Sequence, residues 1–222
     1  MKVFLLAAGI GKRLRPLTNS LPKPLIEVHG KPIILWSIER LRDSGFKEIV
    51  INLFYKGEQI KKFLGDGSNY GVKIEYSFED DLLGTGGGIQ KALNLLGDEQ
   101  FLLVSTDIWT DYNFEKLCMP NNSQAHMVLI QNPDSNYLGD AYFNQGLVKI
   151  TGKGSKLTYS GISLLEPQLF SHINCSKYEL WDSVLLPASE ENLVTGEVFN
   201  GVLFNINNID DMERLDSYLS QS

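Results

Sequence analysis

Short apolar runs alternate with helical patterns through the first 130 residues. Residues 2–8 (KVFLLAA) are apolar after Lys2 and break at Gly9 and Gly11, as a buried strand entering a glycine loop does. Similar runs follow at 48–54, 72–78, 101–104 and 127–130. Between them, residues 32–41 and 88–96 place apolar side chains at helical spacing ahead of a glycine. This alternation predicts βαβ units, and therefore a Rossmann-like α/β fold whose mostly parallel mixed sheet is flanked by helices on both faces.

The second half of the chain is less regular. Residues 141–150 predict a hairpin that turns at 144–146, and the segments 157–164 and 194–206 predict further strands. A helix is expected near 180–188, and residues 209–219 predict a closing amphipathic helix. Because no repeat, low-complexity tract or linker divides the chain, we expect a single domain over residues 1–222, with a lid-like insertion after about residue 130.

Composition narrows the class of protein. With 222 residues, 43% of them hydrophobic, the chain has enough core to fold without disulfides or structural metals. Cys118 and Cys175 show no C-x-x-C spacing and no charged-then-apolar leader opens the chain, which together favour a cytoplasmic location. No apolar run reaches the roughly 18 residues of a membrane span. The net charge of −7 argues against non-specific nucleic-acid binding, so an anionic ligand must be held by local cations and backbone amides.

The glycine loop after the first run is the first candidate for such a site. It reads AAGIGKRLRPLT over residues 7–18 and continues into LPKPL at 21–25. Glycine amides that approach a ligand closely, followed by cations, suit phosphate groups. A P-loop is excluded by Leu6 and Arg13, and a Rossmann fingerprint by Leu14. A basic, proline-rich surface loop is the alternative, but these cations stand at the carboxyl end of a strand, where open α/β sheets bind ligands.

The pattern G-x-G-x-R-L-x-P-L-T with a following P-K-P resembles the nucleoside triphosphate:sugar-1-phosphate nucleotidyltransferases. The resemblance extends along nearly the whole chain and is closest to the short, single-domain members typified by N-acetylmuramate 1-phosphate uridylyltransferases, which serve the cell wall. Further segments that carry it are 49–52, 64–68, 85–89, 107–112, 160–163 and 195–197. It implies the nucleotide-diphospho-sugar transferase fold, with residues 1–130 as the nucleotide-binding core and residues 131–222 completing it and binding the sugar.

The resemblance also implies a reaction. An oxygen of a sugar 1-phosphate attacks the α-phosphorus of a nucleoside triphosphate, and pyrophosphate leaves. Because the nucleophile is already an anion, no general base is required, and the enzyme must neutralise charge and align the reacting oxygens. The resemblance further makes UTP the expected nucleotide and Mg²⁺ the expected cofactor. Two alternatives stay open: a mannose-1-phosphate guanylyltransferase activity, and a homologue that binds nucleotide or nucleotide sugar without turnover. Nothing in the sequence indicates an oligomeric state.

The residue roles that the resemblance implies fall into four sets. The catalytic residues are Arg13, Lys23 and Asp107. The nucleotide-binding residues are Leu6, Ala7, Ala8, Gly9, Gly11, Lys12, Arg13, Lys23 and Gly86, and the sugar-binding residues are Gly87, Asp107, Asp140, Ser160 and Gly161. The metal ligands are Asp107 and Asn205. Without the resemblance, Asp107 would be interpreted as a turn or cap residue, 86–88 as a helix-entry turn and Asp140 as a solvated loop carboxylate.

Three positions depart from the family pattern. Ser105-Thr106 stands where an Asn-Gly usually precedes the metal aspartate, and Asn205 stands where a second aspartate is usual. Glu179 replaces a lysine expected near the sugar phosphate, so it would repel a dianion if it points inward. An asparagine offers Mg²⁺ an oxygen without charge, and we therefore expect weaker metal binding than in the rest of the family.

Overall fold

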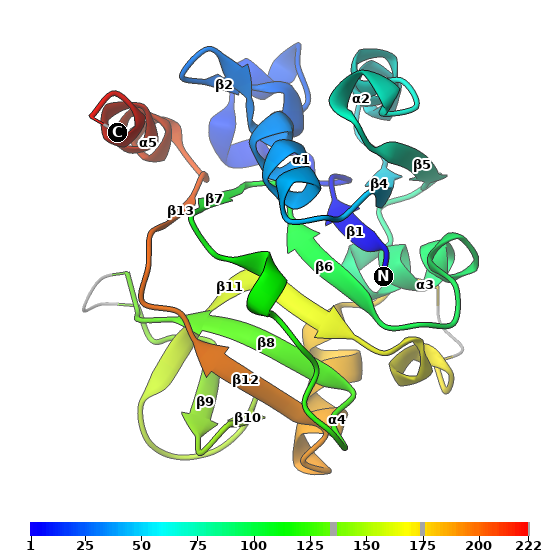
Figure 1. The fold of residues 1–222 in the computed structure, drawn as a ribbon, viewed down its shortest axis with the longest axis vertical. Coiled ribbons are helices and arrows are strands. Elements are labelled where there is room, and N and C mark those ends of the chain that lie inside the picture. Colours follow the sequence, from blue (N-terminus) through cyan, green and yellow to red (C-terminus); the bar gives the residue numbers. More distant parts are fainter. Residues whose placement is uncertain (134–136, 174–175, 222) are drawn as a thin grey trace.

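A nine-stranded mixed sheet forms the centre of the protein (Figure 1). The computed structural model describes residues 1–133, 137–173 and 176–221. The strand order is β5 (Lys73–Phe78), β4 (Glu48–Leu53), β1 (Val3–Leu6), β6 (Phe101–Ser105), β11 (Lys156–Leu165), β8 (Ala125–Ile130), β12 (Val194–Val198), β10 (Leu147–Lys149) and β9 (Ala141–Asn144). The first four are mutually parallel, whereas β11 runs antiparallel to both of its neighbours. Hence the α/β fold with a mixed sheet that the sequence predicted is confirmed.

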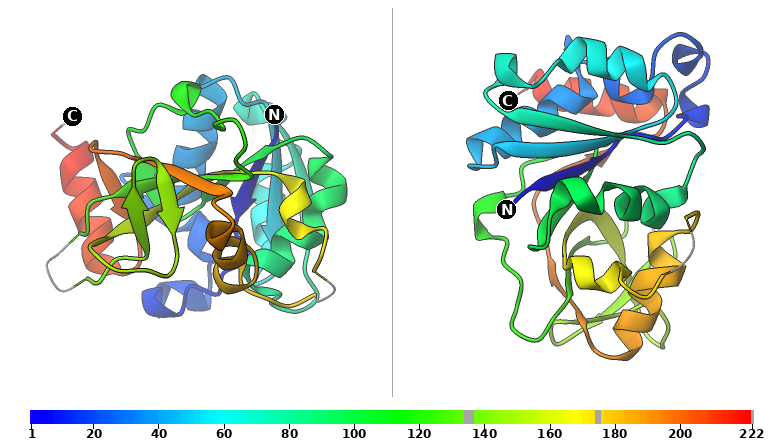
Figure 2. Two further views of the ribbon diagram at one scale, coloured as in Figure 1. Left: turned by 90° about the horizontal axis from the view of Figure 1, so that it is seen from below. Right: turned by 90° about the vertical axis from the view of Figure 1, so that its right-hand side faces the viewer.

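Helices cover both faces of the sheet, and the alternation of side chains along β1 shows why (Figure 2). Val3 and Leu5 pack into one core cluster with α1 (Ile33–Asp43) and α2 (Gly57–Leu64). Phe4 points to the opposite face, into a cluster with α3 (Gly84–Leu96) and α4 (Leu186–Glu190). All three strand residues are fully buried, as expected for a strand covered on both sides.

Smaller elements surround this core. They are β2 (Glu27–Val28), β3 (Lys31–Pro32), β7 (Ile108–Thr110), β13 (Leu203–Asn205), α5 (Ile209–Leu219) and short 3₁₀ turns at Lys12–Leu14, Leu17–Asn19, Lys23–Leu25, Ser68–Tyr70, Phe114–Lys116 and Pro167–Phe170. A third core cluster joins Leu14 of the glycine loop to Ile206 and to Leu215 of α5. The end of the chain is therefore packed against its beginning.

Four expectations about the elements need correction. The strand predicted over 194–206 is two strands, because 199–202 leave the main sheet and β13 pairs with β7 instead. The helix predicted over 180–188 is a π-helical turn (Trp181–Leu185) followed by α4. Helix α3 begins at Gly84, four residues earlier than predicted, and α2 was not predicted. The region after residue 130 is not an insertion, since β11 lies between β6 and β8 in the middle of the sheet.

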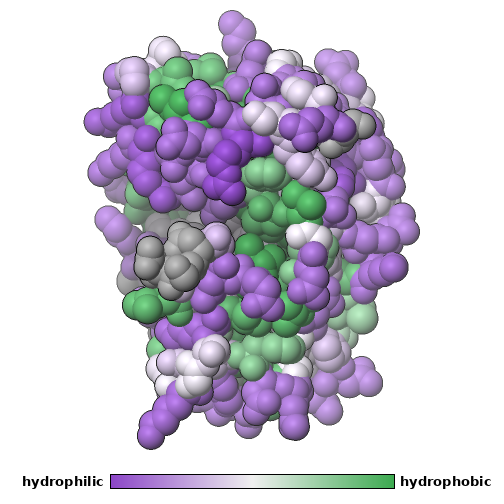
Figure 3. Space-filling view, turned by 90° about the vertical axis from the view of Figure 1, so that its left-hand side faces the viewer, coloured by the Kyte–Doolittle hydropathy of each residue, from purple (hydrophilic) through white to green (hydrophobic). Residues whose placement is uncertain are grey.

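The surface is mixed in character. On the side drawn in Figure 3, apolar surface gathers in a central band with mainly polar surface around it. Within the described ranges, none of the helices has both the length and the apolar character needed to cross a bilayer. Cys118 is exposed with a free thiol, and Cys175 lies outside the described residues.

Candidate active site

The glycine loop leaves β1 at the carboxyl edge of the sheet and folds back on itself. Gly11 has a left-handed backbone (φ 68°), and a Cβ there would lie 2.9 Å from Thr18 Cγ2 and 3.0 Å from Lys23 Cβ. The Thr18 hydroxyl donates a hydrogen bond of 3.0 Å to the Gly11 carbonyl, and the Tyr55 hydroxyl donates one of 2.9 Å to the Thr18 carbonyl. Glycine is thus required at position 11 by both conformation and space.

This loop forms one wall of a pocket of about 230 Å³ that contains all three predicted catalytic residues. Its lining consists of Gly9, Gly11, Lys12, Arg13, Leu14, Lys23, Asp107 and Asn207. Lys23 Nζ donates to Asp107 Oδ2 at 2.6 Å, and the two side chains are 13% and 31% exposed. Arg13 Nη2 donates to Asn207 Oδ1, also at 2.6 Å. Residues far apart in the sequence therefore place three cations and one carboxylate around glycine amides, which is an arrangement suited to a polyphosphate.

A second cleft of about 320 Å³ adjoins the first, because both include Gly9 and Asp107. It is lined by Leu6, Ala8, Gly9, Asn52, Glu79, Leu82, Gly84, Thr85, Ser105, Asp107 and Glu179. Of the residues predicted to bind nucleotide, Leu6, Ala8 and Gly9 are in this lining, while Ala7 is buried next to it. The two cavities together offer a cationic end, at the glycine loop, and a larger end of mixed character.

A buried polar network beneath this cleft was missed by the sequence analysis. Asn52 Oδ1 accepts a hydrogen bond of 2.8 Å from the Ala7 amide, and Asn52 Nδ2 donates to Glu79 Oε1 at 2.7 Å. Glu79 Oε2 accepts from the Leu83 amide at 3.1 Å. Asn52 is 2% and Glu79 6% exposed, so these bonds satisfy groups that would be costly to bury alone. The sequence did contain a signal for this network: Asn52 lies near the end of the predicted strand 48–54, and Glu79 directly follows the predicted strand 72–78.

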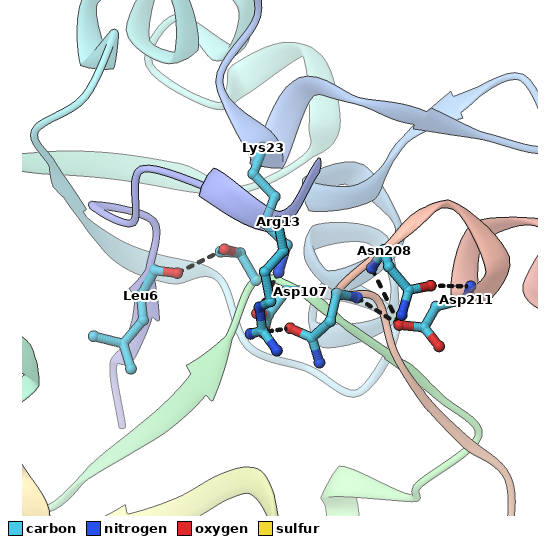
Figure 4. Close-up of polar contacts among 8 residues, drawn as sticks. Leu6, Arg13, Lys23, Asp107, Asn208 and Asp211 are labelled. Carbon is cyan, nitrogen blue, oxygen red and sulfur yellow. Dashed lines mark hydrogen bonds and ion pairs between the residues drawn. The ribbon is translucent and has the colours of Figure 1, made fainter. Parts of the chain in front are cut away.

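Asp107 is held at the end of β6 by its neighbours. The Thr106 hydroxyl donates to the Leu6 carbonyl at 2.6 Å, which ties β6 to β1 (Figure 4). The Ile206 amide donates to the Asp107 carbonyl at 2.8 Å and continues the pairing of β7 with β13. That pairing sets the exposed Asn205 opposite Ile108, the residue after Asp107. Asn207 was assigned no role from the sequence, yet it lines the pocket beside Asp107.

The glycines at the start of α3 lie inside the helix and against another segment. The amides of Gly86 and Gly87 both donate to the Tyr178 carbonyl at 3.1 Å. A Cβ on Gly86 would lie 2.3 Å from the Tyr178 ring, and one on Gly87 would lie 2.3 Å from the Ser176 carbonyl oxygen. Neither residue is among those that line the second cleft, whereas Gly84 and Thr85 are. Close packing, the simpler of the two interpretations, accounts for these glycines, and their predicted contacts with nucleotide and sugar remain predictions.

Glu179 has a local partner at the cleft. Its Oε2 accepts hydrogen bonds from the Thr85 hydroxyl at 2.9 Å and from the Thr85 amide at 3.3 Å, in the first turn of α3. The Leu180 amide donates in turn to the Thr85 hydroxyl at 3.0 Å. A carboxylate at a helix N-terminus is stabilised by the helix dipole. The departure from the family lysine is thus accommodated, with the carboxylate lining the cleft.

The remaining predicted sugar-binding residues lie around β11 and outside the lining of both cavities. Asp140 accepts from the Tyr137 hydroxyl at 2.9 Å and from the Tyr159 amide at 2.8 Å. Ser160 is 2% exposed and accepts from the Ile162 amide. Gly161 has a φ of 85° at a β-bulge, and its Cβ would lie 3.0 Å from Cβ of Ser105, a residue of the second cleft. Gly161 therefore borders the cleft through Ser105.

A cluster of polar side chains around the buried His126 and the partly exposed Glu197 ties β12 to the segment after β7. Glu197 Oε1 accepts from the Tyr112 hydroxyl at 2.6 Å, and Glu197 Oε2 lies 3.5 Å from His126 Nε2. His126 Nδ1 lies 2.9 Å from Thr195 Oγ1. Burial lowers the pKa of His126, against the opposing effect of Glu197, and burial together with Glu197 raises the pKa of Tyr112. His126 is consequently neutral near pH 7.

These features define an α/β protein with a cationic, glycine-lined pocket at the carboxyl edge of its sheet. The nucleotidyl transferase family model matches residues 2–138, and the chain belongs to this family. It is 40% identical over 217 residues to N-acetylmuramate alpha-1-phosphate uridylyltransferase of Neisseria meningitidis serogroup B, covering 94% of each chain. It is 37% identical to mannose-1-phosphate guanyltransferase of Yarrowia lipolytica over 68% of this chain and 43% of that one.

The fold agrees with this assignment. HddC from Yersinia pseudotuberculosis, solved in complex with GMP-PN, superposes with a TM-score of 0.81 at 22% identity, over 98% of this chain and 99% of that one. At this identity the likeness concerns the fold alone. The family resemblance inferred from the loop motifs is confirmed by the family match and by the relative that is similar over 94% of this chain.

Proposed function

We propose that the protein makes a nucleotide sugar from a nucleoside triphosphate and a sugar 1-phosphate and releases pyrophosphate. The observation that carries this proposal is the convergence of Arg13 and Lys23 with Asp107 around the glycine loop, in one pocket at the carboxyl edge of the sheet. Phosphoryl and nucleotidyl transfer depend on positioning and on neutralising charge, and these residues supply cations for phosphate oxygens.

The lining residues of the two cavities support an arrangement of the substrates. The triphosphate occupies the loop pocket, with the amides near Gly9 and Gly11 and the cations Arg13 and Lys23 around it. The nucleoside and the sugar share the adjoining cleft, which begins at Gly9 and Asp107. In this arrangement residues 1–130 hold the nucleotide, and residues 131–222 complete the site and contact the sugar through the region of Glu179 and Gly161.

Mg²⁺ is the proposed cofactor, and the donor groups fit it. Within the described part of the chain, no three His, Cys, Asp or Glu side chains cluster as a metal site. Among the residues that the structure describes, Asp107 alone offers a carboxylate in the loop pocket, with the amide oxygen of Asn207 in the same lining and Asn205 on the neighbouring strand. Mg²⁺ typically binds through one or two carboxylates plus phosphate oxygens and water. Asp107 would hold the ion, which when bound neutralises phosphate charge.

The chain's own groups account for the remaining chemistry. A phosphate oxygen of the sugar 1-phosphate forms a bond to the α-phosphorus. The bond between that phosphorus and the oxygen that bridges it to the β-phosphorus breaks. The electron pair leaves with pyrophosphate, and no proton has to move. Lys23 stabilises charge at the α-phosphate as a point charge, whereas the planar guanidinium of Arg13 suits the departing β and γ phosphates. The glycine amides orient the chain of phosphates for in-line displacement.

The identity of the two substrates is proposed from the relatives. The relative that shares 94% of its length with this chain is named for uridylyl transfer to N-acetylmuramate 1-phosphate, which makes UTP and that sugar the first pair to test. The mannose-1-phosphate guanyltransferases are similar over a smaller share of this chain, and GTP with mannose 1-phosphate is the second pair. Glu179 in the cleft adds a negative charge on the sugar side, so sugar preference is the least transferable property.

The experiment is a pyrophosphate-release assay over a matrix of UTP, GTP, ATP and dTTP against several sugar 1-phosphates with Mg²⁺. We expect release with UTP and at least one sugar 1-phosphate, and none without the acceptor. Arg13→Ala is the matched negative control, because it removes a proposed phosphate ligand from the surface of the loop. Binding of UTP without turnover on any acceptor would favour a nucleotide-binding homologue of this family over an enzyme.

A further inference from the structure

Arg13 of the glycine loop is bonded to a residue 194 positions further along the chain. Its Nη2 donates to Asn207 Oδ1 at 2.6 Å, and both residues line the loop pocket (Figure 4). Arg13 lies on the short turn Lys12–Leu14 and is exposed to solvent. The direction of the guanidinium is therefore set from the other end of the chain.

Asn207 is itself fixed on both sides. Its amide donates to Asp211 Oδ2 at 2.9 Å, and Asp211 and Asn208 form a reciprocal capping box that begins α5. Asp211 also accepts from the Asn208 amide at 3.2 Å, and the Asp211 amide donates to Asn208 Oδ1 at 2.8 Å. On the other side, Ile206 is fully buried and bonds to the Asp107 carbonyl. A capping box of this kind holds the entry of a helix firmly.

We propose that Asn207 is a positioning residue that orients Arg13 toward the triphosphate before the nucleotide binds. The proposal rests on the proposed function, because it assigns Arg13 to the departing phosphates. A flexible arginine that is already held in the binding direction loses less conformational freedom when the ligand arrives. The segment that leads into α5 thereby becomes part of the phosphate site, although it lies outside residues 2–138, the part that the family model matches.

The choice of an amide follows from electrostatics. The Asn207 oxygen accepts a hydrogen bond but carries no net charge, so the guanidinium keeps its full positive charge for phosphate. A carboxylate at the same position would bond Arg13 more strongly, would neutralise it and would repel the triphosphate. Asn207→Ala removes the hydrogen bond, whereas Asn207→Asp keeps the size of the side chain and adds a negative charge. The two substitutions therefore have distinct predicted effects on nucleotide affinity, which a purely structural role of Asn207 would not produce.

The affinity test uses calorimetric titration of UTP with Mg²⁺ into the full chain and a double-mutant cycle. We expect Asn207→Ala to raise the Kd about three- to tenfold, which is the usual range for losing one hydrogen bond. Asn207→Asp should raise it by about tenfold or more, through charge. Asn208→Ala removes the cap side chain but keeps Asn207 and the Asp211 carboxylate that accepts from the Asn207 amide. It should therefore lower the melting temperature and change the Kd less than about twofold. In an Arg13→Ala background, Asn207→Ala should have no further effect.

Hydrogen exchange of the nucleotide-free chain tests the contact independently of the proposed function. We expect Asn207→Ala to speed exchange of the Leu14 and Arg15 amides, which bond to Gly11 and Lys12 carbonyls within the turn, and Asn208→Ala to leave them nearly unchanged. Unchanged exchange in Asn207→Ala, or an equal loss of affinity with and without Arg13, would overturn the inference. If the unaltered chain bound no nucleoside triphosphate, the proposed function would fail, and the exchange data would still decide whether Asn207 holds the loop.

Discussion

The Lys23 ammonium and the Asp107 carboxylate form an ion pair of 2.6 Å inside the loop pocket. Each group is proposed to serve a different part of the substrate, the lysine the α-phosphate and the aspartate the metal ion. In the absence of nucleotide they satisfy one another, which lowers the cost of keeping two charges partly out of water. When a metal-loaded triphosphate binds, the α-phosphate becomes the proposed partner of Lys23 and the metal ion that of Asp107. The ion pair therefore stabilises the two charges only in the nucleotide-free protein.

Replacing Lys23 by alanine is expected to lower kcat at least about tenfold, equivalent to about 1.4 kcal/mol of transition-state stabilisation. Lys23→Arg should not restore the rate, because a planar fork does not reproduce a compact point charge. Steady-state pyrophosphate release measures both variants. Lys62→Ala, on the exposed side of α2, is the control of equal charge change. Unchanged rates in both Lys23→Ala and Arg13→Ala would contradict the assignment of the loop pocket as the triphosphate site.

The metal dependence should follow the charge near Asp107. Asp107→Asn is expected to raise the Mg²⁺ concentration for half-maximal activity, because it removes the carboxylate from the loop pocket. Asn205→Asp is expected to lower that concentration, since it adds a carboxylate opposite Ile108 on the paired strand. A Mg²⁺ titration at fixed nucleotide distinguishes them. The same metal dependence in Asn205→Asp and the unaltered chain would show that this residue is not at the metal position.

The two glycines of the loop should respond differently to alanine. Gly11→Ala forces a side chain into a left-handed backbone and against Thr18 and Lys23, so we expect a loss of roughly 1–3 kcal/mol in unfolding free energy. A Cβ on Gly9 meets no atom within 4 Å, and Gly9→Ala should leave stability nearly unchanged while weakening nucleotide binding in the pocket. Urea unfolding and UTP titration separate the effects. A stable Gly11→Ala variant would contradict the packing argument.

Acid should destabilise the protein through His126. Burial lowers its pKa below the ordinary value of 6.5, so as the pH falls through 6.5 the unfolded chain binds a proton that the folded chain does not. The free energy of unfolding then falls, by at most about 1.4 kcal/mol per pH unit for this one site. Glu197 and Tyr112 face the same cluster, and Glu197 opposes the effect.

His126→Gln isolates this contribution, because an amide can still bond Thr195 and Glu197 but does not titrate near neutrality. The difference in unfolding free energy between pH 7.5 and 5.5, measured by urea titration, should be smaller in the variant than in the unaltered chain. An equal or larger pH dependence in His126→Gln would show that His126 does not contribute in this direction.

The parallel half of the sheet was predictable because its strands are continuous apolar runs ahead of glycine or polar residues, as in β1 with Phe4 and Leu5 buried on opposite faces. The glycine loop was predictable because its chemistry is local: Gly11, Arg13 and Lys23 lie within thirteen residues. Helix α2 was missed because it is short: its eight residues make about two turns, and its apolar side chains, Ile60, Phe63 and Leu64, form a single helical repeat. The split of 194–206 was missed because pairing of β13 with β7 is a tertiary choice.

The non-local parts of the site could not be predicted in the same way. No pattern near Arg13 indicates that its partner is Asn207, and no pattern near Glu79 indicates that it bonds Asn52 beneath the cleft. Glu179 was expected to repel a dianion if it points inward, and the structure adds that its carboxylate already accepts two hydrogen bonds from Thr85. Such contacts depend on which loops meet at the carboxyl edge of the sheet, and the linear sequence does not give that information.

The most direct test of the account is calorimetric titration of the unaltered chain with UTP and with GTP in the presence of Mg²⁺, beside the double variant Arg13→Ala/Lys23→Ala. We predict saturable binding of at least one of the two nucleotides to the unaltered chain, and a loss of affinity of about a hundredfold or more in the double variant, as expected for two charge-assisted contacts. Binding that is equally tight in the double variant, or no binding of either nucleotide to the unaltered chain, would contradict the assignment of the glycine loop as the polyphosphate site.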